Sequence, residues 1–154
     1  MAITGKPYTK TEMAIANPII KAMSRLNTWV YRASGGRIGG KFLRGAPVML
    51  LTTVGRKSGQ RRTAPLLYLR DGEKVVCVAS KGGMPNHPLW FRNLEANPNV
   101  EVQIGSEIIP MRAAIVDNDE KAMYWPKLTA MYRDFDDYQA RTERDIPVVV
   151  LTPR

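Results

Sequence analysis

Cysteine, histidine and long apolar runs are scarce in this 154-residue chain, and each shortage excludes a class of protein. The single cysteine, Cys77, excludes an internal disulfide and a cysteine-rich metal site, and its apolar surroundings indicate a small buried side chain. The single histidine, His87, would have to serve any Ser/His/Asp or Cys/His catalytic arrangement. No apolar run reaches the roughly 18 residues of a membrane-spanning helix, and the N-terminus lacks a signal-peptide pattern, so we expect a cytoplasmic protein.

Acidic residues are almost missing from the first half of the chain. Residues 1–70 contain thirteen Lys or Arg and one acid, Glu12, which gives a balance of +12. Residues 71–154 contain ten Lys or Arg and thirteen acids, which gives −3. A strongly basic half indicates an anionic partner. Charge alone leaves three candidates open: a nucleic acid, a phospholipid surface and a polyanionic small molecule.

Four cations lie in or beside one short loop between two apolar runs, 48–54 and 61–69. They are Arg56, Lys57, Arg61 and Arg62. Glycines at 55 and 59 permit a tight turn with exposed backbone N–H groups, which predicts an anion site that includes Ser58. The alternative is a solvated hairpin tip. The loop is not a Walker loop, because the first glycine of that motif is missing and a strand follows, and it lacks aromatic residues for stacking nucleic-acid bases.

The helix predicted over 15–33 is amphipathic, because its apolar residues recur at helical spacing. These residues are Ile15, Ile19, Ala22, Met23, Leu26, Trp29, Val30 and Ala33. The opposite face carries Lys21, Arg25 and Arg32. Such a helix could dock its apolar face on the core or lie on an anionic membrane. Docking is favoured, because most amphipathic helices in small domains cover a sheet.

The remaining pattern predicts a mainly β protein of the α+β class. Strands are expected at 48–54, 61–69 and 74–79, as a meander with a tight turn at Asp71-Gly72, and further strands at 100–104, 107–116 and 146–151. Helices are expected after Pro88 and from Asp117 to about Met131. About six strands suggest an antiparallel sheet curled into a small barrel with helices packed outside. We expect residues 1–40 to form the helix and a glycine-rich connector, and residues 41–154 to form the barrel domain.

The chain has few nucleophiles or acid/base groups, so covalent chemistry would require a cofactor. A flat ring could be lined by Ser80, Lys81, Gly82 and Gly83, by Trp90-Phe91, and by the aromatic cluster Tyr124, Trp125, Tyr132, Phe135 and Tyr138. Aromatic clusters more often form core, but residues 131–139 are polar enough to favour a partly exposed pocket rim. The nearby aspartates are too uniform to indicate a metal site, and no metal is expected.

Six ordered blocks resemble the deazaflavin-dependent nitroreductase family of actinobacteria, over residues from about 21 to 151. The blocks are Leu50 to Gln60, Ala79 to Gly83, Pro88 to Leu94, Asn97-Pro98, Tyr124 to Pro126 and Ile146 to Val150. The resemblance implies a split β-barrel that binds coenzyme F420, a deazaflavin whose tail carries a phosphate and several glutamate carboxylates. It also implies a hydride transfer from the reduced coenzyme to a quinone, an activated enone or a nitroaromatic compound.

The resemblance further implies roles for individual residues. Arg56, Lys57 and Ser58, with Arg61 or Arg62, would bind the phosphate and tail, and Lys81, Gly82, Gly83 and Trp90 would flank the ring and ribityl part. Tyr132, Tyr138 and Ser80 are the candidates for contacts with the acceptor. Leu67 and Phe135 stand at the substrate rim where tyrosines are expected, so activation of bulky nitroimidazoles is not expected.

Two other readings remain open from the sequence. The barrel could bind FMN, because related split barrels hold its phosphate with cations. The protein could instead be a non-catalytic binder of an anionic surface. A catalytic protein could also contact the inner face of the plasma membrane through residues 15–33, and this would suit a lipid-soluble quinone.

Overall fold

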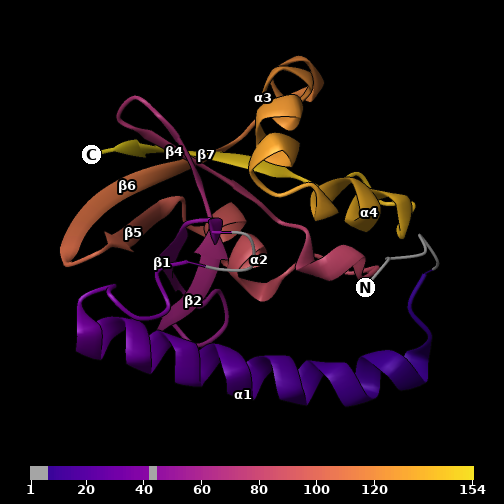
Figure 1. Cartoon of the computed structure of the whole chain (residues 1–154), viewed down its shortest axis with the longest axis horizontal. Helices are drawn as coiled ribbons and strands as arrows, with labels where there is room; N and C mark the ends of the chain where they lie inside the picture. The colour runs from indigo at the N-terminus through magenta and orange to yellow at the C-terminus, as the bar shows by residue number, and fades with distance from the viewer. Residues whose placement is uncertain (1–6, 42–44) are drawn as a thin grey trace.

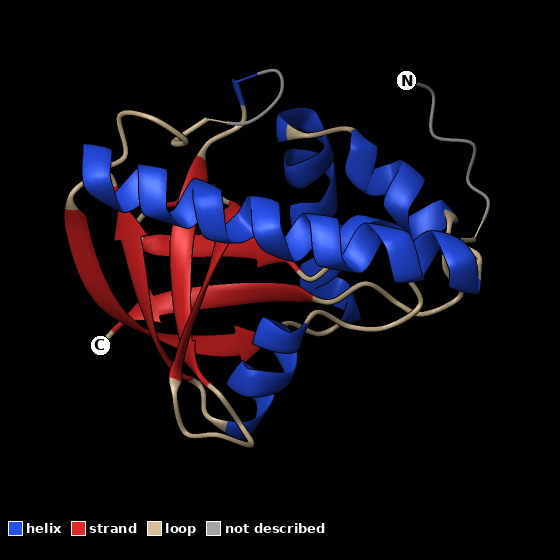
Figure 2. Cartoon of the chain, turned by 90° about the horizontal axis from the view of Figure 1, so that it is seen from below, coloured by secondary structure: helices blue, strands red, loops and turns tan. Residues whose placement is uncertain are grey.

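One curled antiparallel sheet forms the centre of the molecule in the computed structural model, which describes residues 7–41 and 45–154 (Figure 1). Its strands follow the order β2-β1-β5-β6-β7-β4-β3. They are β1 (Val48–Val54), β2 (Arg61–Leu67), β3 (Leu69–Asp71), β4 (Lys74–Val78), β5 (Asn99–Ile104), β6 (Glu107–Ile115) and β7 (Val148–Pro153). The curl brings β2 into contact with β4 from the other end of the sheet (Figure 2). The prediction of an antiparallel split barrel with packed helices is confirmed.

The path of the chain between β2 and β4 differs from the predicted meander. The run 61–69 breaks at Tyr68, whose N–H donates to the carbonyl of Pro47 (3.2 Å), and β3 then starts at the opposite edge of the sheet. The turn at Gly72 is confirmed, with a positive φ of 60°, but it joins β3 to β4. On its other side β4 pairs with β7, not with β2. Turn residues fix the local hairpin and carry no information about this distant partner.

The core has two parts, one on each side of the sheet. Inside the curl, Met49, Leu51 and Val102 pack against α2 (Leu89–Ala96), which contributes Trp90, Phe91 and Leu94. Cys77 is fully buried there, and burial raises the pKa of its thiol to about 12, so it is an inert apolar residue as predicted. On the other side, α3 (Asn118–Met131) and α4 (Asp134–Ala140) cover β4 and β7.

The long helix α1 (Lys10–Ser34) begins at a capping box and ends at a glycine. Thr9 accepts a hydrogen bond from the Glu12 N–H (3.1 Å), and the Glu12 carboxylate accepts one from the Thr9 N–H (2.8 Å). At the other end Gly35 takes a left-handed conformation with φ of 62°, which ends the helix where the glycine-rich connector was predicted. The helix lies across the outer face of the sheet (Figure 2).

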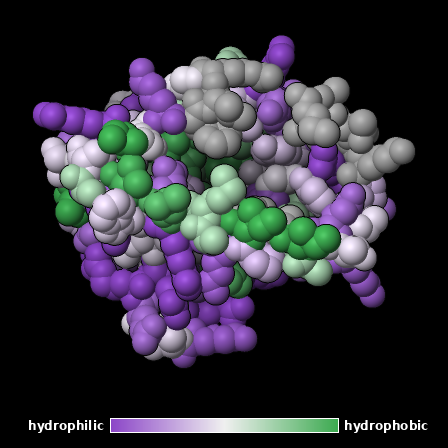
Figure 3. All heavy atoms as spheres, turned by 60° about the horizontal axis from the view of Figure 1, so that its bottom comes forward, coloured by the Kyte–Doolittle hydropathy of each residue, from purple (hydrophilic) through white to green (hydrophobic). Residues whose placement is uncertain are grey.

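The prediction that the apolar face of α1 docks on the core is wrong. The helix contacts the sheet through its more polar side, where the hydroxyl of Tyr31 accepts a hydrogen bond from the Gly105 N–H (2.8 Å) and donates one to the carbonyl of Gln103 (3.3 Å). The large apolar side chains point outward and form an exposed band (Figure 3), each between 54% and 68% exposed: Ile15, Ile19, Met23, Leu26 and Trp29. Among the helices that the structure describes, none is long and apolar enough to cross a membrane.

Candidate functional site

The loop between β1 and β2 is closed by its own backbone, so its cations project into solvent. Gly55 N–H donates to the Gln60 carbonyl (2.7 Å), and Gly59 N–H donates to the Gly55 carbonyl (2.8 Å). Gly59 has a φ of +69°, which favours glycine, whereas a Cβ on Gly55 would lie 2.7 Å from Ser58 Oγ and 3.2 Å from the Gln60 carbonyl oxygen, so a side chain there would require Ser58 to rotate. The side chains of Arg56, Lys57 and Ser58 are exposed at the tip, where they can reach an anion.

Asn93 of α2 fixes the base of this loop, although it was assigned no role when the block Pro88 to Leu94 was identified in the sequence. Its Oδ1 accepts from the Arg56 N–H (3.1 Å), and its Nδ2 donates to Thr53 Oγ1 (3.1 Å). Asn93 is only 7% exposed, so its amide is a buried connection between the helix and the loop. Such a side chain reduces the number of conformations that the loop can adopt and therefore preorganises the cations that follow it.

The two remaining cations of the predicted set begin β2. The Arg61 guanidinium pairs with the Glu101 carboxylate on β5 at 2.7 Å, but both side chains are partly exposed, so the pair contributes little to stability. Arg62 lies beside Gly55, since a Cβ built on that glycine would be 3.7 Å from Arg62 Cγ. The structure thus places all five predicted residues of the anion site on one hairpin.

The segment from Ser80 to Gly83 forms a second, strained turn next to α4. Three consecutive residues have positive φ, Lys81 (46°), Gly82 (63°) and Gly83 (80°). A Cβ on Gly83 would lie 2.6 Å from the Tyr138 carbonyl, so the turn packs directly on α4 and only glycine fits there. Burial, followed by the charge of Arg144, lowers the pKa of Lys81. A non-glycine residue held at positive φ is uncommon and often marks a binding site.

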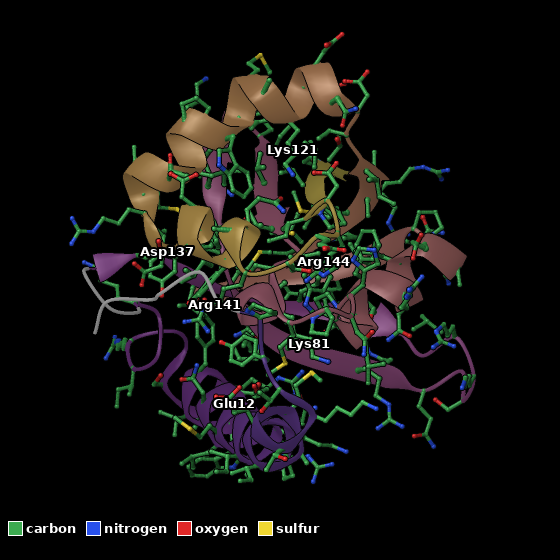
Figure 4. The ribbon with its side chains drawn as sticks, turned by 90° about the vertical axis from the view of Figure 1, so that its right-hand side faces the viewer. Glu12, Lys81, Lys121, Asp137, Arg141 and Arg144 are labelled. Carbon is green, nitrogen blue, oxygen red and sulfur yellow. The ribbon has the colours of Figure 1, made fainter. Side chains whose placement is uncertain are left out.

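Arg144, a residue that the sequence did not single out, holds this second turn in place (Figure 4). Its guanidinium donates to the carbonyls of Ala79 (3.1 Å), Ser80 (2.7 Å) and Met84 (2.9 Å). It also lies 3.0 Å from His87 Nδ1. Burial, followed by the positive charge of Arg144, lowers the pKa of His87, which favours the neutral ring as an acceptor. His87 therefore has a structural contact in the loop.

The aromatic residues of the predicted acceptor site gather beside this turn. The hydroxyls of Tyr132 and Tyr138 are 3.1 Å apart, and Phe135 packs edge-on against Tyr132 with ring centroids 5.1 Å apart. Leu67 packs against the same cluster from β2. Tyr138 and Leu67 are half-buried, as expected at a pocket rim, but Tyr132 and Phe135 are only 4% and 3% exposed. The expectation of a partly exposed rim is therefore wrong for these two, because Phe135 and Tyr132 fill the space between α3 and α4.

Burial raises the pKa of the Tyr132 and Tyr138 hydroxyls above that of free tyrosine. In Tyr132 the contact with Tyr138 raises the pKa further. Both hydroxyls therefore stay protonated at neutral and moderately alkaline pH and can donate hydrogen bonds. Ser80, the third candidate, is 9% exposed, and its carbonyl is held by Arg144.

Two elements connect the hairpin loop and the turn at 80–83. Helix α2 holds the hairpin loop through Asn93, while its N-terminal neighbour His87 contacts Arg144. Trp90 lies between them on the same helix, packed into the core with only 9% exposed. The segment just before α1 also reaches the turn, because a Cβ on Gly82 would lie 3.5 Å from the Tyr8 hydroxyl, and the Arg141 guanidinium lies 4.8 Å from the centroid of the Tyr8 ring.

The fold and the two loops together define a split-barrel protein with a cation-rich hairpin loop and a second, glycine-containing turn. A model of the F420H(2)-dependent quinone reductase family matches residues 23–153. The chain therefore belongs to this family, and it is an F420-dependent reductase.

Individual relatives agree with the family match. An F420H(2)-dependent quinone reductase of Mycobacterium tuberculosis is 42% identical over 133 residues, which cover 84% of this chain and 89% of the relative. The solved structure of an F420-H2 dependent reductase is 40% identical, with a TM-score of 0.64 over 68% of this chain and 93% of that one. A structure described as a domain-swapped dimer is 34% identical, with a TM-score of 0.66 over 82% of this chain and 94% of the other. The comparisons give the FMN alternative no support.

Proposed function

We propose that this protein binds reduced F420 between the hairpin loop and the turn at 80–83 and reduces a quinone. The observation that carries the proposal is the closed hairpin loop, whose exposed cations are positioned by the buried amide of Asn93. A phosphate and carboxylates are the ligands for which the guanidinium of Arg56 and the ammonium of Lys57 at the tip are suited, with the guanidiniums of Arg61 and Arg62 at the start of β2. The family match supports F420 as the source of those anionic groups.

The residues present fit the coenzyme in two places. Arg56, Lys57 and Ser58 would hold the phosphate, with Arg61 and Arg62 beside them on the same hairpin. Gly82 has no side chain and is partly exposed, so a flat ring can approach the backbone closely there, whereas Gly83 is packed against α4. Lys81 and Trp90 would flank the ring and ribityl part. The bound coenzyme supplies a hydride from the carbon that replaces N5 of a flavin.

The acceptor would lie on the side of Tyr132, Tyr138 and Ser80. A quinone oxygen gains negative charge during hydride transfer, and a protonated hydroxyl pointed at that oxygen stabilises the transition state. Tyr138 is the better placed of the two tyrosines, because it is half-buried whereas Tyr132 is buried. Leu67 is half-buried and offers apolar surface without a hydroxyl, which suits a quinone ring and a lipid-like substituent. Enones and nitroaromatic compounds are further acceptors of the same electron-poor class.

The direct test of this function is a titration of the purified protein with oxidised F420, followed by turnover assays with reduced F420 and a soluble quinone. We expect saturable binding near micromolar concentration, since a few charge-assisted hydrogen bonds of about 1.5–3 kcal/mol each suffice for that affinity. FMN serves as the competing ligand. Saturable binding of FMN without binding of F420 would overturn the proposal.

Replacing Tyr138 with phenylalanine should lower kcat for a quinone by about ten- to a hundredfold and leave the Kd of F420 unchanged. The pH profile tests the same role. The pKa of the Tyr138 hydroxyl is raised above the usual tyrosine value near 10. Its neutral, donating form is therefore present at every pH below that value and is lost only at a higher pH than in free tyrosine. Wild-type kcat should therefore show no decline from tyrosine ionisation up to about pH 9.

A matched control for this variant is Tyr124→Phe. The Tyr124 hydroxyl donates to the Asp71 carboxylate (2.6 Å) and lies away from the turn at 80–83, so its loss should leave kcat near the wild-type value. Equal losses of kcat in the two variants would show that Tyr138 acts only through stability.

We also infer that the exposed band on α1 contacts an anionic membrane surface. Five large apolar side chains face away from the core, and the basic half of the chain gives the attraction to anionic lipid that such a helix requires. A membrane-bound protein would meet a lipid-soluble quinone where that quinone is concentrated. The proposal concerns only the outward band and does not require a spanning helix.

Replacing Leu26 and Trp29 with glutamine should reduce cosedimentation with phosphatidylglycerol vesicles by about fivefold or more, because two exposed apolar side chains lose their burial in lipid. Turnover of a soluble quinone should stay unchanged. The membrane assignment would be contradicted if the wild-type protein formed a dimer through this band and did not bind vesicles. Sedimentation equilibrium detects the dimer, and cosedimentation detects vesicle binding.

A further inference from the structure

A cavity of about 590 Å³ adjoins the turn at 80–83, beside the expected acceptor site. Its walls come from Pro7 just before α1, from Pro85 after the turn, and from residues 140–144 at the end of α4. Arg141 connects the cavity with the turn, because a Cβ on Gly83 would lie 3.0 Å from the Arg141 Cβ and 2.6 Å from the Tyr138 carbonyl oxygen. A substituent of an acceptor bound at Tyr138 can therefore extend into this cavity.

Arg141 lies on the same side of α4 as Tyr138. It follows Tyr138 by three residues, and its N–H donates to the Tyr138 carbonyl (3.2 Å), so its backbone still has the geometry of a helical turn. Side chains three residues apart on a helix are neighbours, with Cβ atoms about 5–6 Å apart. One small acceptor molecule can therefore reach the Tyr138 hydroxyl with a quinone oxygen and the Arg141 guanidinium with a substituent.

The Arg141 guanidinium has donors that the protein does not use. Within residues 7–41 and 45–154 it forms no ion pair, and its Nε–H is buried without a hydrogen-bond partner. It lies over the Tyr8 ring, 4.8 Å from the ring centroid, between the end of α4 and the segment before α1 (Figure 4). Stacking uses the flat face of a guanidinium and leaves the N–H groups along its edge for a ligand. A buried donor without a partner is costly, and a ligand oxygen that pairs with it removes this cost.

The charged residues around Arg141 do not neutralise it. The Glu12 carboxylate accepts the Thr9 N–H (2.8 Å), and hydrogen bonds with Thr9 lower the pKa of Glu12 most, while the charge of Arg141 adds a smaller lowering. Glu143 also lines the cavity, but it is exposed, so water and salt screen its charge. The other cation of the lining, Arg144, already donates to three backbone carbonyls. The charge of Arg141 is therefore available to a ligand in the cavity.

We propose that Arg141 binds a carboxylate on the acceptor, and that the enzyme thereby prefers quinones with an acidic substituent beside the reacting ring. The edge of a guanidinium matches a carboxylate with two parallel hydrogen bonds. The carboxylate takes no part in the hydride transfer and only holds the ring against Tyr138. A neutral substituent in the same place would leave the guanidinium unpaired. The inference rests on the proposed function as a quinone reductase.

The test compares a 1,4-naphthoquinone that carries a propanoate side chain with its methyl ester, which has the same ring without the charge. Equilibrium dialysis against the protein saturated with oxidised F420 gives the Kd of each quinone without turnover, and assays with reduced F420 give KM and kcat. We expect the wild type to bind the propanoate about tenfold more tightly than the ester. Arg141→Gln should remove this preference by weakening the propanoate about tenfold. Arg141→Lys should keep part of it, because an ammonium has the charge but not the paired donors.

The control variant is Arg112→Gln, which removes the same charge at an exposed position on β6, away from the cavity (Figure 1). It should keep the preference of the wild type for the propanoate. The inference would be overturned by a wild type that binds both quinones equally, by an Arg141→Gln variant that weakens both by the same factor, or by an equal loss of preference in the control. If the wild type instead binds no F420 or turns over neither quinone, the proposed function is overturned and the inference with it.

Discussion

Replacing Arg56 and Lys57 together with glutamine is expected to weaken F420 binding by about thirty- to a hundredfold. Both side chains are exposed at the hairpin tip, and neither makes a side-chain hydrogen bond or ion pair within the described part of the chain. Their charge is thus available to the phosphate, and two charge-assisted contacts reduced by exposure amount to about 2–3 kcal/mol. A fluorescence titration with oxidised F420 gives the Kd, and the Tm should not change.

A control variant with Arg70→Gln and Lys74→Gln, two exposed residues on the β3–β4 hairpin, separates a local contact from a general loss of positive charge. It should keep the wild-type Kd within about twofold, because charges beyond a Debye length of about 10 Å are screened at ordinary salt. If the control and the Arg56/Lys57 variant weaken F420 equally, the hairpin attracts the coenzyme only through net charge. If neither does, the phosphate is bound elsewhere.

Replacing Arg144 with methionine should lower the free energy of unfolding by about 3 kcal/mol and the Tm by about 10 °C. The substitution removes the guanidinium donor from the carbonyls of Ala79, Ser80 and Met84, although the Ser80 carbonyl keeps the Gly83 N–H at 2.9 Å. These carbonyls fix the turn from which Lys81 and Gly82 would contact the coenzyme, so kcat should fall as well. Thermal unfolding followed by circular dichroism, together with a quinone assay at low temperature, measures both effects.

Arg141→Met is the matched control, since Arg141 lies three residues earlier and is also half-buried. The Arg141 guanidinium stacks on the Tyr8 ring, and such a cation–π contact contributes about 1 kcal/mol or less at a partly exposed site. The control should therefore lose much less stability than the Arg144 variant. Equal losses would mean that the three carbonyls find water in place of the guanidinium, and that Arg144 does not position the turn.

Much of the fold followed from local patterns. The strands β1, β4, β5 and β6, the turn at Gly72 and the start of α3 at Asp117 came out close to their predicted places, because alternation, turn glycines and helix caps are local signals. The short helix α4 and strand β3 were not predicted. Three aspartates and two aromatics in seven residues give α4 no clear period, and β3 is only three residues long.

The residues of the candidate site also fall into two groups, those that local sequence patterns predicted and those whose roles appeared only in the folded structure. The cations at 56, 57, 61 and 62 were visible in the sequence because charge and glycine are unusual between two apolar runs. Asn93 and Arg144 were not visible, since one amide in a helix and one arginine in a polar segment resemble ordinary surface residues. Their roles depend on which backbone groups they meet after folding, and those groups lie far away in the sequence.

The sequence by itself predicted an anion site at a glycine-containing hairpin and determined that the chain shares the ordered blocks of an F420-dependent family. Only the tertiary structure decided which way α1 faces. Periodicity places Ile15, Met23 and Trp29 on one side of the helix, but it cannot tell whether that side meets the sheet or solvent. The hydrogen bonds of Tyr31 to β5 and the following turn fix the rotation of the helix, which exposes the apolar band and brings Lys21 and Arg25 opposite Arg61.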